Sequence, residues 1–341
     1  MKQMSRWLQS DLNHMVCPNT RHALSLALGS GEEQMLVGGS RNYEIDTDIA
    51  VFLDYNEATE SQSETVESYA RIISYYDKAI EWLFASTLTN EAALREKMVD
   101  ELRLSVNSRV LDVGAGTARD SVEILRRLGP EGLLYVHDIS VEMLRTAKLR
   151  LSSCGYEAPY RLIQGPAGRL PFDDGALDAL YSFGGLNEFG DFSAVLEEFS
   201  RVVRIGGRIV VGDEGIAPWL VGSEHHRILA ANNPIFFSNP LPIDRLPENA
   251  HDVSLSWVLG NAFYLFSFTV GSDVPPLDLD LEHQGRRGGS LRTRYFGALD
   301  GVDPTLRRHV EAAALKEGVS LKRWLEDGLR TRIKDAEAGE Q

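Results

Sequence analysis

Residues 109–120 read Arg-Val-Leu-Asp-Val-Gly-Ala-Gly-Thr-Ala-Arg-Asp, an apolar run followed by two closely spaced glycines and then a helical pattern. Apolar residues such as Val110 and Leu111 are typical of a strand that is buried on both faces. Gly114 and Gly116 allow the backbone to turn back sharply, which leaves the N-terminus of the next helix open to a ligand. The stretch therefore predicts a strand, a tight turn and a helix that together bind a nucleotide-type molecule.

Two classes of nucleotide cofactor use such a turn, and the neighbouring residues separate them. A dinucleotide-binding turn carries a third glycine, so that strand, helix and pyrophosphate pack closely. Arg119 stands at that position here. Asp112, at the end of the strand, would repel a pyrophosphate and attract a cation. The turn thus disfavours NAD and FAD and favours a sulfonium cofactor that carries an amino group.

The composition of the 341-residue chain is that of a globular protein, and its formal net charge is -15. So acidic a chain is disfavoured as a nonspecific partner of nucleic acid or anionic membrane. Cys17 and Cys154 are too few for a disulfide framework. Residues 1–10 lack the apolar core of a signal peptide, and the apolar run at 257–270 is too short to span a bilayer. We expect a cytoplasmic protein with no membrane span and a small molecule or protein as its partner.

Strand and helix patterns alternate at even spacing from Val110 to Val211. The apolar runs that suit strands are bounded by glycines, acidic residues or turns, and amphipathic stretches lie between them. Farther along, two alternating runs flank Gly260 and Asn261, which predicts a hairpin. The predicted strands are 110–113, 132–136, 162–165, 177–183, 204–211, 253–257 and 264–270.

Three features resemble class I S-adenosylmethionine-dependent methyltransferases of the small-molecule type found in ubiquinone and menaquinone biosynthesis. They are the aspartate-x-glycine-x-glycine of Asp112 to Gly116, the acidic Asp138 that ends the next strand, and the glycine pair at 206–207. The resemblance implies an α/β fold: a Rossmann-like, seven-stranded, mostly parallel sheet with an antiparallel hairpin at its edge, plus a small N-terminal ribbon-like module and C-terminal helices. It also implies S-adenosyl-L-methionine as cofactor and a small-molecule methyl acceptor.

Asp138 is the clearest of the cofactor-binding residues that this resemblance implies, because one carboxylate can accept hydrogen bonds from both ribose hydroxyls. Ile139 and Met143 would flank the adenine, with a core position as the alternative for Met143. The acid that related enzymes place near Pro166 to bind the adenine amine is missing. The expected cofactor-binding residues are Asp112, Gly114, Ala115, Gly116, Thr117, Asp138, Ile139, Met143, Phe183 and Gly184.

The methyl acceptor is expected at the carboxyl ends of the strands, where open parallel sheets bind ligands. Asn187 and Glu188 follow the fourth strand, and we expect substrate contact from Asn187 and proton acceptance from Glu188. His226 is a second candidate for the proton acceptor. Tyr76 lies in an aromatic segment that resembles the lid of small-molecule methyltransferases, and a core role is the alternative.

An arginine-rich stretch with several glycines, residues 285–297, stands out in this acidic chain. Guanidinium groups bind carboxylate or phosphate through bidentate hydrogen bonds. Arg292, Arg294 and Tyr295 are therefore expected to bind an acceptor that carries such an anionic group. The alternative is a solvated loop.

Four regions are expected along the chain. The first, residues 1–59, resembles the zinc-ribbon module of methyltransferase activators, but Thr20 stands where a Cys-Pro-x-Cys knuckle has its second cysteine. One thiol cannot build a tetrahedral zinc site, so we expect no metal and a degenerate ribbon that serves in packing. The other regions are a helical lid at 60–104, a methyltransferase domain at 105–300 with a substrate-recognition insertion at about 213–250, and C-terminal helices at 301–341.

The C-terminal segment supplies an alternative function. A strand expected at 291–299, followed by helices at 305–318 and 320–333, resembles a ribbon-helix-helix unit, a fold that dimerises and can bind DNA. Basic and acidic residues nearly balance in these helices, which favours dimerisation or packing over binding to nucleic acid. The alternative to methyl transfer is therefore a DNA-binding or partner-activated regulatory protein, and a homodimer is compatible with both functions.

Overall fold

The computed structural model describes residues 7–29, 33–54, 58–238, 241–284, 289–296 and 303–339. The chain divides into two compact units, Met1–Pro275 and Pro276–Gln341. Every strand among the described residues belongs to the first unit.

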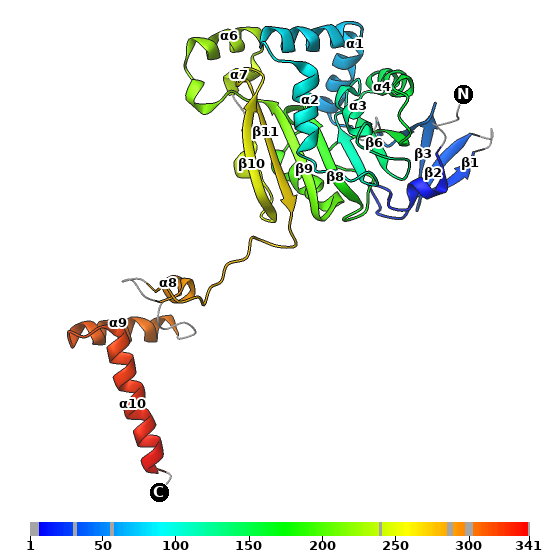
Figure 1. Ribbon diagram of the computed structural model, residues 1–341. Helices are drawn as coiled ribbons and strands as arrows, with labels where there is room; N and C mark the ends of the chain where they lie inside the picture. The colour runs from blue at the N-terminus through cyan, green and yellow to red at the C-terminus, as the bar shows by residue number, and fades with distance from the viewer. Residues whose placement is uncertain are drawn as a thin grey trace. The chain divides into compact units, whose positions relative to one another are not determined.

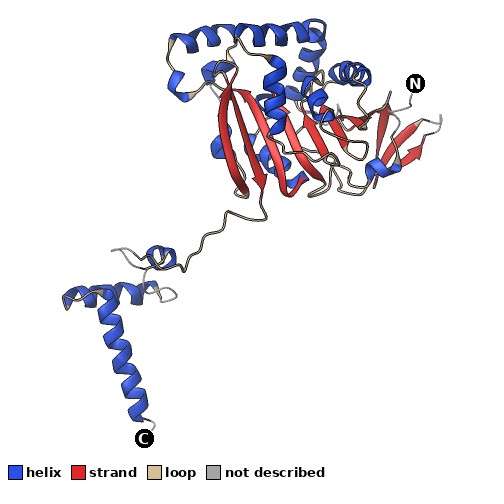
Figure 2. Cartoon of the chain, in the orientation of Figure 1, coloured by secondary structure: helices blue, strands red, loops and turns tan. Residues whose placement is uncertain are grey.

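The first unit is built on one eleven-stranded sheet with the order β1-β2-β3-β4-β7-β6-β5-β8-β9-β11-β10 (Figures 1 and 2). Neighbouring strands run parallel from β7 to β9 in this order, and β11 pairs antiparallel with both β9 and β10. The seven strands from β7 to β10 confirm the predicted Rossmann-like sheet with its edge hairpin. They are β5 Arg109–Val113, β6 Leu133–Asp138, β7 Tyr160–Gln164, β8 Leu177–Phe183, β9 Val203–Glu214, β10 Ala250–Val258 and β11 Phe263–Val270.

Helices cover both faces of this sheet, because successive side chains of a strand point to opposite faces and both faces are apolar. Val110 and Val136 pack with α2, α3 and α4 on one face. Leu111 and Tyr135 pack with α5 on the other. These helices are α2 Glu91–Asp100, α3 Arg119–Leu125, α4 Val141–Ser153 and α5 Phe192–Val202.

The turn between β5 and α3 has the backbone conformation for which its glycines are needed. Gly114 and Gly116 have φ angles of +67° and +54°, in the left-handed region that a Cβ disfavours. A Cβ at Gly114 would also lie 2.8 Å from Cζ of Phe189. The turn directs the Gly116 N–H at the carboxylate of Asp138, at the end of β6.

Four N-terminal strands extend this sheet rather than standing apart from it. Strands β1 Ser25–Leu28, β2 Gln34–Gly38 and β3 Arg41–Asp46 pair antiparallel in succession, and β4 Ile49–Val51 pairs antiparallel with β3 and parallel with β7. Cys17 of the ribbon-like segment is buried, and its sulfur lies 2.9 Å from the Tyr43 hydroxyl and accepts a hydrogen bond from the Thr20 N–H. The segment is thus continuous with the sheet that carries the glycine turn.

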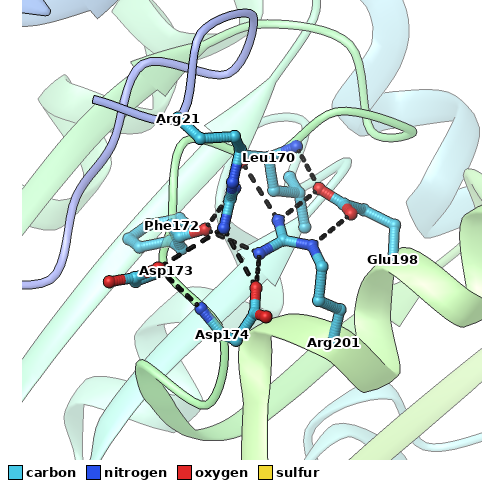
Figure 3. Close-up of polar contacts among 7 residues, drawn as sticks. All are labelled: Arg21, Leu170, Phe172, Asp173, Asp174, Glu198 and Arg201. Atoms are coloured by element: carbon cyan, nitrogen blue, oxygen red, sulfur yellow. Dashed lines mark hydrogen bonds and ion pairs between the residues drawn. The ribbon is translucent and has the colours of Figure 1, made fainter. Parts of the chain in front are cut away.

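Two arginines attach the N-terminal segment and α5 to one turn between β7 and β8 (Figure 3). Arg21 and Arg201 each donate from Nη1 to the Phe172 carbonyl oxygen at 2.9 Å. Both also reach Oδ1 of Asp174, at 3.0 and 2.7 Å. Exposed ion pairs contribute little individually, but here a shared carbonyl and carboxylate tie three segments together. The cluster consists of Arg21, Leu170, Phe172, Asp173, Asp174, Glu198 and Arg201.

The second unit contains α8 Leu291–Tyr295, α9 Pro304–Lys316 and α10 Leu321–Gly339. The predicted strand at 291–299 is wrong in its described part, since residues 291–295 are helical; residues 297–299 lie outside the described residues. Ser290 accounts for the helix, because its hydroxyl accepts from the Thr293 N–H while the Thr293 hydroxyl accepts from the Ser290 N–H. This capping box starts a helix where the resemblance to a ribbon-helix-helix unit predicted a strand.

A buried ion pair predicts how strongly the N-terminal segment stabilises the first unit. Arg161 on β7 donates from Nε to Asp11 Oδ2 at 2.6 Å, and the two side chains are 6% and 10% exposed. Asp11→Ala would leave the guanidinium buried without its carboxylate, so we expect the free energy of unfolding to fall by about 3 kcal/mol. Urea unfolding followed by circular dichroism measures the difference.

Asp46→Ala is the matched control for this variant. Asp46 pairs with Arg145 at 2.8 Å, but the side chains are 33% and 55% exposed. Water screens such a pair, so we expect a loss of less than about 1 kcal/mol. If the free energy of unfolding fell equally in the two variants, the buried pair of Asp11 and Arg161 would contribute no more than the exposed one.

Candidate active site

Two adjoining cavities lie at the carboxyl ends of the central parallel strands. The inner cavity measures about 50 Å³ and the outer one about 720 Å³. Open parallel sheets bind ligands at this edge, so the two cavities together form the candidate site. Both are lined by Thr65, Tyr69, Tyr76, Gly114, Gly184 and Glu188.

Asp138, the last residue of β6, lines the inner cavity. Its Oδ2 accepts from the Gly116 N–H and its Oδ1 from the Ser140 N–H, both at 2.8 Å. Burial raises the pKa of this carboxyl to about 6, although the backbone hydrogen bonds act in the opposite direction. Each oxygen keeps a second lone pair, so the carboxylate can still accept hydrogens from two hydroxyl groups.

His137 lines the inner cavity next to Asp138. Its side chain is buried, and neither ring nitrogen has a hydrogen-bond partner among the described residues. Burial lowers the pKa of His137 to about 4, so the imidazole is neutral at neutral pH. The sequence carried one signal for this residue, its place directly before the acidic end of a predicted strand.

Helix α1, Glu60–Ser86, contributes residues to both cavities. The rings of Tyr69 and Tyr76 line both, with centroids 6.2 Å apart. Asp77 attaches the helix to the glycine turn, because its Oδ1 accepts from the Thr117 hydroxyl at 2.7 Å. Asp77 also pairs with Arg150 of α4 at 2.5 Å. The position of α1 over the site therefore depends on the turn after β5.

Carboxylates gather in the outer cavity, where Glu188, Asp213 and Glu214 form part of the lining. Burial raises the pKa of Glu188, and Glu214 raises it further, while a hydrogen bond with Tyr69 acts in the opposite direction. Burial and Glu214 together raise the pKa of Asp213 well above its usual range. The Asn187 N–H donates to Oδ2 of Asp213 at 2.7 Å. The apolar lining consists of Ile72, Ala79, Ile80, Leu83, Phe84, Ala115, Phe183, Ile235 and Phe263.

Asp112 lines neither cavity, and its contact with the cofactor stays a prediction. Its side chain is buried, and its Oδ2 accepts from the Ser121 hydroxyl at 2.5 Å. Burial and the nearby Asp120 raise the pKa of Asp112 to about 8, so this carboxyl is protonated at neutral pH. The side chain points to the face of β5 that α3 covers, because it shares that face with Val110.

His226 contacts two backbone groups, and its predicted catalytic role stays a prediction. It lies on α6 Glu224–Asn232, where its Nδ1 accepts from the Gly222 N–H at 3.0 Å and its Nε2 lies 2.9 Å from the Phe236 carbonyl oxygen. A neutral ring that accepts at Nδ1 carries its proton on Nε2. Both nitrogens are therefore engaged, and His226 lines neither cavity.

Arg292, Arg294 and Tyr295 lie on α8 of the second unit. Within that unit, Arg292 donates from Nε to Asp280 Oδ1 at 2.7 Å. Residues 286 and 287, the other arginines of this stretch, lie outside the described residues. A role of the stretch in binding an anion stays a prediction.

The other expected residues divide between the two cavities. Gly116, Ile139 and Met143 line the inner one, whereas Ala115, Thr117, Phe183 and Asn187 line the outer one. Sequence reasoning missed several polar lining residues that come from separate elements, because only the tertiary structure brings them together. They are Tyr69, Arg95, Asp120, His137, Asp213 and Glu214.

Comparison with known proteins covers the residues that line the inner cavity and most of those that line the outer one. Residues 57–215 match the ubiE/COQ5 methyltransferase family. A demethylmenaquinone methyltransferase of Geobacillus kaustophilus is 34% identical over 116 residues, which cover 34% of this chain and 49% of that protein. The demethylmenaquinone methyltransferase of Mycolicibacterium gilvum is 42% identical over 113 residues, 33% of this chain and 44% of that protein. This region is a class I S-adenosylmethionine-dependent methyltransferase domain. Its cofactor is S-adenosyl-L-methionine.

The chain spans about half the length of these relatives. Among solved structures, a SAM-dependent methyltransferase from Aquifex aeolicus is similar at 18% identity, with 54% of this chain and 96% of that chain covered and a TM-score of 0.38. No helix in the described ranges is both long enough and apolar enough to cross a membrane.

The charges of the methyltransferase site predict how the pKa of Asp138 responds when a neighbouring carboxylate is removed. Its pKa is raised to about 6, and the negative charge of Glu188 is one of the causes. Glu188→Gln removes that charge, so we expect the pKa of Asp138 to fall, whereas Glu197→Gln on the exposed side of α5 should leave it unchanged. Carbon-13 NMR titration of the Asp138 carboxyl measures both. A pKa of Asp138 near its usual value in the unmodified protein would contradict the buried environment.

Proposed function

We propose that the chain transfers the methyl group of S-adenosylmethionine to a small aromatic acceptor that carries hydroxyl groups. The observation that supports this most is the outer cavity, which combines aromatic and aliphatic walls with carboxylates and adjoins the inner cavity at Glu188. Carboxylates accept hydrogen bonds from hydroxyls, and apolar walls bind an aromatic ring. The names of the relatives point to the same class, since they specify demethylmenaquinone.

The residues of the inner cavity suit the nucleoside of the cofactor. Asp138 offers one lone pair on each oxygen to the two ribose hydroxyls, and Ile139 and Met143 offer apolar surface to the adenine. The cofactor brings an electrophilic methyl group on a positively charged sulfur. Carboxylates around the site attract that charge. The inner cavity alone is smaller than the roughly 300–1,000 Å³ of most ligand pockets, but it shares six lining residues with the larger outer cavity.

Glu188 is our candidate for the proton acceptor. It stands where the two cavities meet, and its raised pKa makes it a stronger base than an exposed glutamate. Taking the proton of an acceptor hydroxyl raises the electron density of the aromatic ring, and a ring carbon then bonds to the methyl group as the bond between sulfur and that group breaks. The hydrogen on the attacked carbon next moves through solvent to the ring oxygen, which restores the aromatic ring and its hydroxyl. Asn187 and Glu214 supply further polar groups to hold the acceptor in line.

An acceptor with a carboxylate or phosphate, which the arginines of the C-terminal stretch predicted, is not the one that this cavity favours. Its two lining arginines are already paired, Arg95 with Asp120 at 2.6 Å and Arg119 with Glu91 at 2.7 Å. The remaining carboxylates would repel an anion. No observation favours the DNA-binding alternative, and we do not adopt it.

Calorimetry and a radiolabelled methyl-transfer assay test the proposed function directly. S-adenosylhomocysteine should bind and NADH should not, and the label should pass to reduced demethylmenaquinone or to another hydroxylated aromatic ring of similar size. Transfer to carboxylated or phosphorylated acceptors alone would overturn the assignment of the acceptor. Failure to bind either S-adenosyl ligand would overturn the proposed function as a whole.

The hydrogen-bonding capacity of Asp138 predicts how affinity for the cofactor changes on substitution of this residue and with pH. Asp138→Ala removes two hydrogen bonds to a charged group, so the Kd for S-adenosylhomocysteine should rise about 30-fold or more. In the unmodified protein the carboxyl is protonated below its pKa of about 6. Affinity should therefore be full above that pH and fall as the pH drops through it. Calorimetry from pH 5 to 8 measures this dependence. A constant affinity for S-adenosylhomocysteine over that range would contradict the role of the Asp138 carboxylate in binding the cofactor.

Glu188→Gln tests the proton acceptor. The amide keeps the size of the side chain but cannot take a proton, so kcat should fall by about 100-fold or more. The Kd for S-adenosylhomocysteine should change less than about threefold, and Glu197→Gln should match the unmodified protein in both quantities. An unchanged kcat would remove Glu188 from the mechanism while leaving the cofactor site intact.

A further inference from the structure

The two long helices of the second unit have almost no core of their own. Among the described residues of that unit, Ser290 and Ala314 alone are buried. Large apolar side chains stay exposed on both helices, at 54% for Leu306 and 82% for Leu315 on α9 and 60% for Leu329 on α10. Helices of 13 and 19 residues fall below the roughly 40 residues that fold without a metal, a disulfide or association. Their apolar faces therefore need a cover.

The longest apolar row runs along α10. Side chains four residues apart lie on one side of a helix and form a ridge that can fit the grooves of another helix. On α10 this row is unbroken over four positions, of which the first two are half-buried and the last two are 60% and 58% exposed. The row, called the α10 ridge below, consists of Leu321, Leu325, Leu329 and Ile333.

Side-chain hydrogen bonds fix the start of α10. The Ser320 hydroxyl accepts from the Arg323 N–H at 3.2 Å, as an N-cap residue does. The indole N–H of Trp324 donates to Oε1 of Glu317, in the turn after α9, at 3.0 Å. Both contacts lie at the end of α10 where the ridge is half-buried. The exposed second half of the ridge is thus presented by a helix whose first turn is held in place.

The charges beside the α10 ridge are complementary to themselves. Glu326 follows Leu325 and Arg330 follows Leu329, about 100° farther around the helix. Both charges therefore lie along one edge of the ridge, on either side of its centre. In an antiparallel pair of identical helices, this edge meets the same edge of the other copy in the opposite direction. Each Glu326 then faces an Arg330, whereas a parallel pair would bring the edge against the opposite one, where Gly328 lies.

We propose that α10 is a dimerisation helix, and that its ridge packs antiparallel against the α10 ridge of a second copy of this chain. Glu326 of each copy pairs with Arg330 of the second copy. Ridges of this kind interdigitate at a crossing angle of about −50°, and a two-fold axis makes the interface the same on both copies. The apolar ridge supplies the attraction, and the charges select the orientation. This pairing needs no strand at 291–299 and is independent of the proposed function.

Sedimentation velocity on the full chain tests the dimer. An interface of two crossing helices is of the small, transient class, so the dimer should dissociate at roughly micromolar concentrations. Leu329→Glu combined with Ile333→Glu brings like charges together in the contact, and the dimer Kd should rise about 100-fold or more.

Leu315→Glu is the matched control for the ridge variant, because this leucine is exposed on α9 outside the ridge. Its dimer Kd should change less than about threefold. Two results would overturn the inference: an unmodified chain that is still monomeric at about 100 μM, or a dimer that persists unchanged in the ridge variant.

Charge reversal tests the antiparallel pairing and guards against loss of folding. Glu326→Arg and Arg330→Glu should each raise the dimer Kd about tenfold at low salt, because like charges then meet between the two copies. An equimolar mixture of the two variants should form a heterodimer with a Kd within about threefold of that of the unmodified dimer, since opposite charges meet again at both contacts. Pairing within one helix cannot produce this recovery. A mixture that associates no better than either variant alone would overturn the antiparallel contact.

Discussion

The geometry of the site depends on one hydrogen bond, the 2.8 Å contact from the Gly116 N–H to Oδ2 of Asp138. It joins the turn after β5 to the end of β6, so the two strands present their carboxyl ends in one fixed relation. The bond requires a left-handed backbone at Gly116, which a residue with a Cβ adopts at a cost. The same turn holds α1 through the Thr117 hydroxyl and Asp77. Strand ends, turn and lid are thus coupled through a few atoms.

The fold followed from the sequence because each central strand is an apolar run and each helix an amphipathic one, and the order of these patterns is that of a Rossmann-like sheet. The position of Asp138 could be predicted for the same reason, since this residue ends a strand. The direction of the Asp112 side chain could not be predicted, because it depends on which face of β5 is covered by α3. The contacts of His226 with the backbone at 222 and 236 could not be predicted from the sequence, because no sequence pattern reports which backbone groups a histidine ring meets.

The residues that sequence reasoning missed have a common physical cause. Asp120, His137 and Glu214 come from a helix, a strand and the end of another strand, and only the packed sheet places them around one space. The strand predicted at 291–299 was wrong in its described part for a local reason, because the capping box at Ser290 starts a helix there. Long periodic elements are therefore predictable here, whereas short ones and converging polar groups are not.

The carboxylates of the outer cavity also bear on turnover under the proposed function. Before transfer, the site holds a cationic sulfur and the anionic Glu188. Afterwards it holds a neutral thioether and a neutral carboxylic acid, because the proton of the acceptor has moved to Glu188. The reaction thus neutralises the sulfonium and the Glu188 carboxylate, two opposite charges whose burial in the site carries a desolvation cost. The loss of charge that accompanies the chemistry therefore also promotes release of the product.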